Sequence, residues 1–246
     1  MMNTLEPAID RQGFAILAGL LSANRVARLV ADLAQALPHA GSSVLRSRGH
    51  LYGVRNLIDV WPPALTVAHE SALCEAVGAV LGRGFGLVRS IFFDKPPGRT
   101  WSLPWHRDLT IAVRELEGAD EDFRRPTVKA GIPHVEAPAW LLREMLTARV
   151  ALDDVVDENG PLLVIPGSHE DARIEDLPCA TDLSERAHPI HLRAGDVLLI
   201  RPLLVHRSAP SRPGTSRHRR TLHFEFAPAV ALPGGVEWHR FLCMTP

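Results

Sequence analysis

Residues 219–226 read Arg-Arg-Thr-Leu-His-Phe-Glu-Phe, and polar and apolar side chains alternate along them. This period of two predicts a half-buried β-strand. One face carries Arg220, Leu222, Phe224 and Phe226, and the other carries Arg219, Thr221, His223 and Glu225. The apolar face is expected to pack on the core between two layers, so the polar face would look into a cavity. The alternative is a surface strand whose polar face is simply solvated.

Further short apolar runs lie between Pro/Gly turns from Phe85 onward. They cover residues 87–95, 146–153, 161–165 and 197–201. Strands of this length separated by turns are typical of an antiparallel sandwich or barrel. A Pro-rich insert lies between Asp120 and Trp140, within 114–145. We expect it to be a long loop that acts as a lid or binding loop.

The first 84 residues have a mainly helical pattern. Ser22 is placed as an N-cap, and the apolar side chains that follow it lie on one helix face that ends at Pro38. A second helix is predicted for residues 71–81, and a short strand for residues 13–17. We therefore predict one domain over 1–246, with a helical part at 1–84 and a β-rich core at 85–228.

Bulk properties exclude several classes of protein. The chain has 246 residues and a net charge of −1, so no strong field attracts nucleic acid or an anionic membrane. Its three cysteines are widely spaced, which argues against a disulfide framework or a zinc–thiolate site. The first residues lack a basic region followed by an apolar stretch, so a signal peptide is not expected. The expected partner is a small molecule and the expected location is the cytoplasm; the oligomeric state stays open.

Trp105-His106-Arg107-Asp108 is the sharpest local signal. In an extended chain, residues i and i+2 point to the same face, so His106 and Asp108 could reach one ion. Two histidines and one carboxylate suit Fe(II) and leave positions for a bidentate cosubstrate and O₂. Alone, the tripeptide could equally be a surface His and Asp near a turn.

A third ligand would have to come from a distant strand, and His206 closes the apolar run that begins at Val197. Such a histidine is often a core residue. Ser208 would share its face, and Arg219 opens the next strand. An arginine inside a cavity needs an anion, and its planar fork fits a carboxylate. The distal carboxylate of 2-oxoglutarate is a natural partner.

The order of these motifs resembles the phytanoyl-CoA dioxygenase family of Fe(II)/2-oxoglutarate oxygenases. After His106-Arg107-Asp108 come Asn159-Gly160-Pro161-Leu162-Leu163-Val164-Ile165-Pro166-Gly167-Ser168-His169, then Ala194-Gly195-Asp196, then His206 and Arg219. Residues 105–113 and 129–135 look like a bacterial branch rather than the branch that acts on acyl-CoA.

The resemblance implies a double-stranded β-helix, or cupin-like jelly roll. It places Fe(II) on His106, Asp108 and His206, and 2-oxoglutarate on Arg219 with Ser208. It implies a hydroxylase that uses O₂ and releases succinate and CO₂. Asp108 favours oxidation without halide, because related halogenases have a small residue there.

The sequence departs from the family at the arginine. The family usually has it about eleven residues after the distal histidine, which here is Arg217; the following strand fits Arg219 better, and Arg217 remains the alternative. Arg107 stands where glutamine is common. Lys95, Trp105, Arg107 and His134 are expected near the cavity mouth as substrate contacts, and each has a structural alternative. His169 is expected to bond backbone groups in its turn.

Two other classes of protein remain. One is a non-catalytic jelly-roll binding protein. The other is a cupin-type metal enzyme that does not use 2-oxoglutarate.

Overall fold

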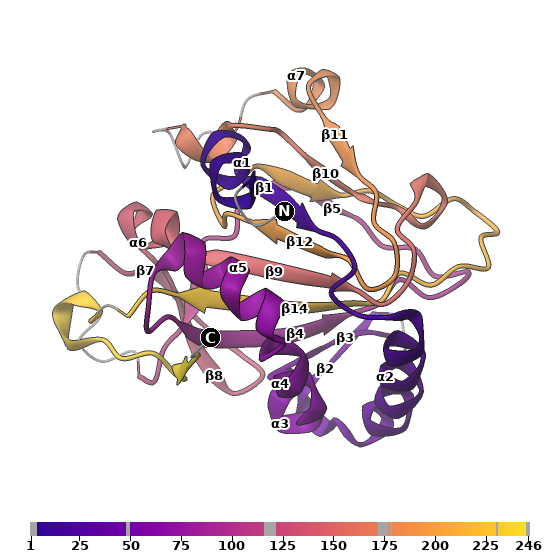
Figure 1. The fold of residues 1–246 in the computed structure, drawn as a ribbon, viewed down its shortest axis with the longest axis horizontal. Helices are drawn as coiled ribbons and strands as arrows, with labels where there is room; N and C mark the ends of the chain where they lie inside the picture. The colour runs from indigo at the N-terminus through magenta and orange to yellow at the C-terminus, as the bar shows by residue number, and fades with distance from the viewer. Residues whose placement is uncertain are drawn as a thin grey trace.

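The alternating stretch forms β14 (Thr221–Ala227), the middle strand of a large antiparallel sheet. This computed structural model describes residues 4–47, 50–115, 122–171, 177, 179–229 and 231–244. The strand order of the large sheet is β1-β12-β9-β14-β4-β3-β2, and β15 also pairs with β4 (Figure 1). A second antiparallel sheet has the order β11-β10-β13-β5, and a third has β6-β8-β7.

The remaining strands of the large sheet are β1 (Phe14–Leu17), β2 (Val44–Ser47), β3 (His50–Arg55), β4 (Gly86–Phe93), β9 (Leu146–Ala151), β12 (Val197–Ile200) and β15 (Leu242–Cys243). The second sheet consists of β5 (Leu103–His106), β10 (Leu162–Val164), β11 (His188–Ile190) and β13 (His206–Ser208). The third consists of β6 (Thr110–Ala112), β7 (Arg124–Lys129) and β8 (Ile132–Glu136). The α-helices are α1 (Leu5–Gln12), α2 (Ala23–Ala36), α3 (Leu57–Val60), α4 (Pro63–Ala68), α5 (Ser71–Leu81), α6 (Ala139–Glu144) and α7 (Ala180–Glu185).

Helices cover one face of the large sheet, and the second sheet lies toward the other (Figure 1). Leu222, Phe224 and Phe226 of β14 are fully buried in one cluster with Leu73 and Val77 of α5. All seven residues of β14 are buried, so its polar face is not a solvated surface. The strand therefore separates a helix-covered core from an interior polar face, as its alternation predicts.

Both predicted N-terminal helices are confirmed. Helix α5 has the predicted bounds, and α2 begins after Ser22, whose Oγ accepts a hydrogen bond from the Arg25 amide at 3.3 Å. This part of the chain also supplies three strands to the large sheet. Strand β1 pairs with β12 and β3 pairs with β4. The N-terminal part is thus structurally continuous with the β-rich core.

The expectation of a long loop in the Pro-rich insert is wrong for its described residues. Strands β7 and β8 form a hairpin whose two-residue turn, Ala130-Gly131, has positive φ at both positions. Pro126 is tolerated because β7 is an edge strand. Prolines alone made this segment look like a loop.

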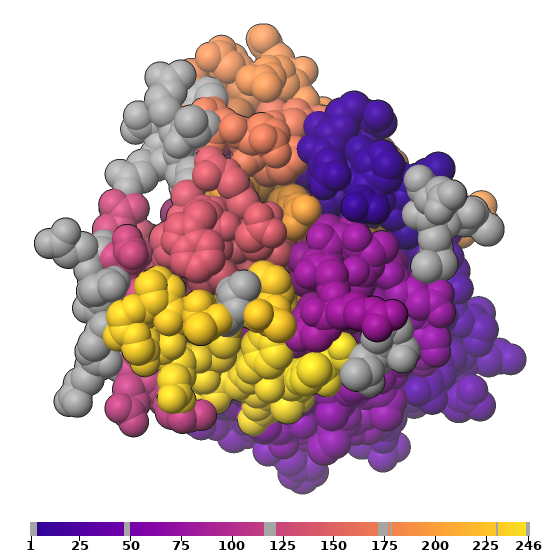
Figure 2. Space-filling model, turned by 60° about the vertical axis from the view of Figure 1, so that its left-hand side comes forward, coloured from indigo at the N-terminus to yellow at the C-terminus, as the bar shows by residue number. Residues whose placement is uncertain are grey.

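Chain beyond residue 228 also belongs to the core. Strand β15 pairs with β4, and the Met244 amide donates to the Phe85 carbonyl at 2.8 Å. Figure 2 shows this yellow segment lying on the molecule beside the purple segment that precedes β4. In the described part of the chain, no helix is long and apolar enough to cross a membrane.

Candidate iron and cosubstrate site

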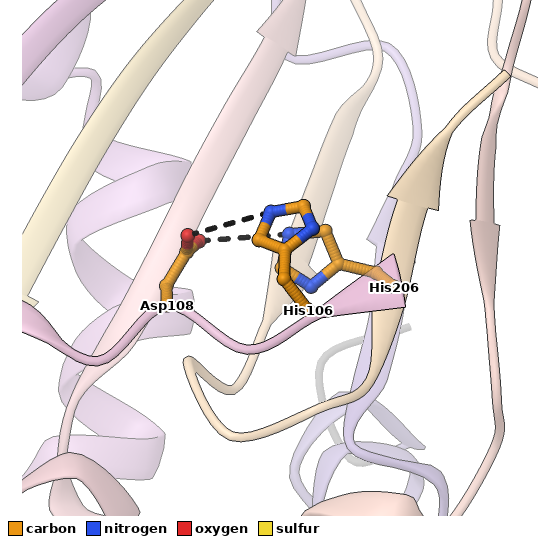
Figure 3. A group of neighbouring side chains, drawn as sticks. All are labelled: His106, Asp108 and His206. Atoms are coloured by element: carbon orange, nitrogen blue, oxygen red, sulfur yellow. Dashed lines mark ion pairs between the residues drawn. The ribbon is translucent and has the colours of Figure 1, made fainter. Parts of the chain in front are cut away.

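The second sheet brings the three predicted metal ligands together. His206 of β13 pairs directly with His106 of β5, and Asp108 follows two residues later (Figure 3). The Asp108 carboxylate lies 3.9 Å from His106 Nε2 and 3.7 Å from His206 Nε2. One ligand atom from each residue lies within 4.8 Å of the other two. In the described residues, this is the one group of three such side chains close enough to share an ion.

Backbone carbonyls orient both imidazoles in the same way. His106 Nδ1 lies 2.7 Å from the Pro104 carbonyl, and His206 Nδ1 lies 2.8 Å from the Leu204 carbonyl. A carbonyl can only accept, so each Nδ1 carries a proton, and in the neutral ring that tautomer leaves the Nε2 lone pair free. Those lone pairs face Asp108, which is the arrangement that a metal requires.

The ionisation of the triad also suits a cation. Burial lowers the pKa of His206 to about 4, so its ring is neutral at pH 7. Burial raises the pKa of Asp108, but electrostatic interaction with His206 and His106 outweighs burial and holds that pKa below its usual value. The donor set therefore includes the neutral imidazole of His206 and the Asp108 carboxylate.

Arg219 lies just before β14 and is buried beside the triad. Its Nη2 donates to Ser208 Oγ at 3.0 Å, and its Nη1 donates to the Gly160 carbonyl at 2.8 Å. Its buried Nε has no hydrogen-bond partner within the described residues. Burial lowers the Arg219 pKa to about 9, so the guanidinium stays charged at pH 7.

Arg217, the alternative anion ligand, lies outside this site. Its Nε donates to Glu158 Oε2 at 3.1 Å, and its side chain is half exposed. The two arginines share parity along the chain, so the alternation of side chains could not separate them. The structure separates them by burial.

Asn159 and Gly160 fix the turn that carries the Gly160 carbonyl, the acceptor for Arg219 Nη1. Asn159 is fully buried and donates to the Asp154 and His218 carbonyls at 2.7 and 2.9 Å. Gly160 has φ +71°, and a Cβ there would collide with the backbone of Ala209. The Gly160 carbonyl is thus fixed in place for Arg219.

His169 bonds backbone as predicted, with its Nε2 3.0 Å from the Asp10 carbonyl. Its neighbour Ser168 accepts a hydrogen bond from the Val205 amide at 2.9 Å. This turn therefore braces the residue before His206.

A pocket joins the triad to the polar face of the large sheet. It is lined by Arg89, Ile91, Phe93, Trp101, Leu103, His106, Asp108, Arg149, Leu162, His206, Ser208 and His223. Arg149 Nη1 lies 3.0 Å from His223 Nδ1, and His223 Nε2 lies 2.9 Å from Glu225 Oε1. Glu225 also pairs with Arg89 Nη2 at 3.2 Å. Arg149, His223, Glu225 and Arg89 therefore form one interior polar network, and all of them but Glu225 line the pocket.

The sequence reasoning missed Arg89 and Arg149 as pocket residues. Each is a lone charge in an otherwise mainly apolar strand, β4 or β9. That isolation was the available signal, because a charge in a buried strand needs a partner or a function.

Lys95 is buried beside Arg219 rather than at a cavity mouth. Its Nζ donates to the carbonyls of Gly160 and Ala209, and it lies 4.7 Å from the centroid of the Trp101 ring. Burial, with the charge of Arg219, lowers its pKa to about 6. Lys95 thus shares the Gly160 carbonyl with Arg219.

The other three predicted substrate contacts do not line the pocket. Trp105 packs with Ile165 and Val205 in a separate hydrophobic cluster. Arg107 Nε donates to the Leu203 carbonyl at 2.9 Å, on the outer side of the ligand strand. His134 is buried in β8, with Nδ1 2.9 Å from the Ile132 carbonyl. All three side chains are buried.

A family model described as phytanoyl-CoA dioxygenase matches residues 9–219. The chain belongs to this family. Among curated relatives, it is 29% identical over 133 residues to the dioxygenase lolE1 of Epichloe uncinata, covering 48% of each protein. It is 26% identical over 173 residues to an ectoine dioxygenase of Bordetella parapertussis, covering 65% of this chain and 47% of the relative. The chain spans about half the length of the curated relatives it matches.

Solved structures of this family's fold superpose on nearly the whole chain. The carbocyclase SnoK from nogalamycin biosynthesis, described as non-haem and α-ketoglutarate dependent, has a TM-score of 0.72 at 17% identity and covers 98% of this chain and 96% of its own. EctD from S. alaskensis, solved with 2-oxoglutarate and 5-hydroxyectoine, has a TM-score of 0.68 at 21% identity, covering 91% and 74%. The predicted jelly-roll fold with flanking helices is confirmed.

Proposed function

We propose that the protein is an Fe(II)- and 2-oxoglutarate-dependent dioxygenase that hydroxylates a small molecule, with release of succinate and CO₂. One observation carries the proposal: the triad of His106, Asp108 and His206 lines one pocket with Ser208, and the buried Arg219 donates to the Ser208 hydroxyl. Family membership supports it, since members include the dioxygenases named above.

The residues present fit a ferrous ion. Two imidazoles and one carboxylate, with both Nε2 atoms aimed at Asp108, are the donors that non-haem Fe(II) oxygenases use. When bound, the iron would supply the oxidation of 2-oxoglutarate and substrate by O₂. The protein's part is to fix three ligands on one side and leave the other side accessible from the pocket.

Arg219 is proposed to hold the distal carboxylate of 2-oxoglutarate. Its unpartnered Nε and its Nη2 offer two adjacent donors, and Ser208 adds a hydroxyl. Lys95, which shares the Gly160 carbonyl, would keep Arg219 positioned. The low-polarity surroundings of this pair strengthen its interaction with a carboxylate.

The proposal is tested by succinate release from 2-oxoglutarate by the purified protein, with and without Fe(II) and ascorbate. We expect release only when both Fe(II) and 2-oxoglutarate are present. His206→Ala should abolish it, while His191→Ala, at an exposed site outside the pocket, should not. Failure of the Ni(II)-loaded protein to bind 2-oxoglutarate would contradict the proposal.

The same experiment separates the other classes. A non-catalytic binding protein would release no succinate. In a metal enzyme that does not use 2-oxoglutarate, the Arg219→Gln substitution would leave activity unchanged. The proposal includes a cytoplasmic location, supported by the three free cysteines Cys74, Cys179 and Cys243.

A further inference from the structure

Three basic side chains lie close together beside the iron pocket, and one of them, Arg89, lines it. They are Arg55 of β3, Arg89 of β4 and Lys129 of β7, and none has a part in the function proposed above. We refer to them as the basic cluster. The chain has only two lysines, Lys95 and Lys129.

Strand register places Arg55 on the pocket side of the large sheet. Arg55 is paired with Ile91, and directly opposed residues share a face. Ile91 and Arg89 both line the iron pocket and are two residues apart in β4. Among the residues that the structure describes, none hydrogen-bonds or ion-pairs with the Arg55 guanidinium.

Thr110 joins the other two members of the cluster. Its carbonyl accepts a hydrogen bond from Arg89 Nη1 at 3.0 Å, and its hydroxyl accepts one from Lys129 Nζ at 3.2 Å. Thr110 follows the proposed ligand Asp108 by two residues. The cluster is therefore tied to the chain that carries the metal ligand.

The cluster carries more positive charge than its neighbours balance. Glu225 pairs with Arg89 but is shared with His223. Glu136, the carboxylate paired with Thr110 across β6 and β8, is bonded to Arg125 at 3.0 Å. Arg89 Nε is buried without a partner in the described residues.

This excess of positive charge changes the pKa values of the cluster's own side chains. Burial and the charge of Arg89 lower the pKa of both Arg55 and Lys129. An anion among the three side chains would relieve this mutual repulsion.

We propose that Arg55, Arg89 and Lys129 form a subsite for an oxyanion, a carboxylate or phosphate group of the primary substrate. This inference rests on the proposed function, because it assumes that oxidation occurs in this pocket.

Distance argues against 2-oxoglutarate as the occupant. Backbone hydrogen bonds pair Lys95 with Arg219, and Arg89 of β4 lies six residues before Lys95, about 20 Å of backbone along an extended chain. A five-carbon diacid held by Arg219 is much shorter than that.

The test is a calorimetric titration of inorganic phosphate into protein loaded with Ni(II) and 2-oxoglutarate, at constant ionic strength. We expect saturable binding that Arg55→Gln and Lys129→Gln each weaken by about tenfold, the loss of one charge-assisted hydrogen bond. Arg55→Lys should keep most of the affinity. Arg83→Gln, the same charge change at an exposed turn, should alter nothing.

A separate titration of 2-oxoglutarate into the Ni(II)-loaded variants identifies the occupant. Unchanged 2-oxoglutarate affinity is expected. Equal weakening of 2-oxoglutarate and phosphate would overturn the inference and assign the cluster to the cosubstrate. If the wild type does not bind 2-oxoglutarate, the proposed function is wrong. The phosphate titration would still test the basic cluster.

A measurement on the wild type covers variants that fail to fold. Lys95 is fully buried, so an amine-selective reagent read by peptide mass should mark Lys129 preferentially. Phosphate should slow that labelling several-fold. Labelling that phosphate does not slow, or phosphate affinity equal in Arg55→Gln and Arg83→Gln, would overturn the inference.

Discussion

At the scale of single residues, the pocket is defined by which charges find partners. Arg217 satisfies its guanidinium at the surface with Glu158, whereas Arg219, two residues later, is buried with one donor unused. An unsatisfied buried donor costs free energy that a bound anion recovers. The contrast between these two arginines gives a direct test of where the cosubstrate binds.

Replacing Arg219 with Gln should raise the KM for 2-oxoglutarate by about 10- to 100-fold, the loss of charged hydrogen bonds worth about 1.5–3 kcal/mol. The matched variant Arg217→Gln should leave that KM within about twofold. Initial rates of succinate release across 2-oxoglutarate concentrations measure both. The opposite ranking of the two variants would assign the carboxylate to Arg217.

His134 predicts a pH dependence of stability in the metal-free protein. Burial lowers its pKa to about 4, against about 6.5 unfolded. The unfolded state therefore binds the extra proton between these values, so this contribution is full above pH 6.5 and lost as pH falls toward 4. The contribution of His134 to the free energy of unfolding is at most about 3 kcal/mol.

Urea unfolding of wild type and His134→Asn between pH 4.5 and 7 measures this contribution. The free energy of unfolding should fall more steeply with acid in the wild type than in the variant. Parallel curves would show that His134 does not titrate differently on folding.

At the scale of elements, the turn before β10 connects the family motif to the anion site. Gly160 and Gly214 both have positive φ, but a Cβ at Gly160 meets the Ala209 backbone while a Cβ at Gly214 meets nothing within 4 Å. Gly214→Ala should cost about 1 kcal/mol in unfolding free energy, from backbone strain alone. Gly160→Ala should cost at least about 3 kcal/mol and raise the KM for 2-oxoglutarate, because its carbonyl moves away from Arg219.

Denaturant unfolding and succinate kinetics on the two variants provide the measurement. Equal costs in both variants, with unchanged KM, would mean that the turn does not position Arg219.

Elements with strong periodicity were predictable from the sequence alone. Helix α5 and strand β14 agree with their patterns because one face of each is buried against the same core cluster. Strand β7 was not predictable, since its residues are nearly all exposed and it contains Pro126. Hydrophobic patterning carries little information where an edge strand packs on nothing.

The same reasoning explains which site residues could be predicted from the sequence. The triad follows from spacing and motif order, and the three predicted ligands lie close together. Arg89 and Arg149 depend on the pairing of β4, β14 and β9, which the sequence does not reveal. Trp105 and Arg107 flank His106 in sequence, but the alternation of side chains along an extended chain turns both away from the pocket.

At the scale of the whole molecule, the two proposed ligands connect different layers. All three proposed metal ligands lie on or next to strands of the second sheet, whereas Arg219 leads into the central strand of the large sheet. A metal alone would stabilise one layer. With 2-oxoglutarate also bound to Arg219, the two sheets are joined across the pocket.

Thermal unfolding should therefore respond to the two ligands in sequence. Ni(II) at about 100 times its Kd should stabilise the wild type by about 2.7 kcal/mol, or about 5–10 °C in Tm, and 2-oxoglutarate should add a second increment. Arg219→Gln should keep the metal increment and lose most of the second, while His206→Ala should lose both. An Arg219→Gln protein that keeps the full second increment would place the cosubstrate within the second sheet alone, with no link between the layers.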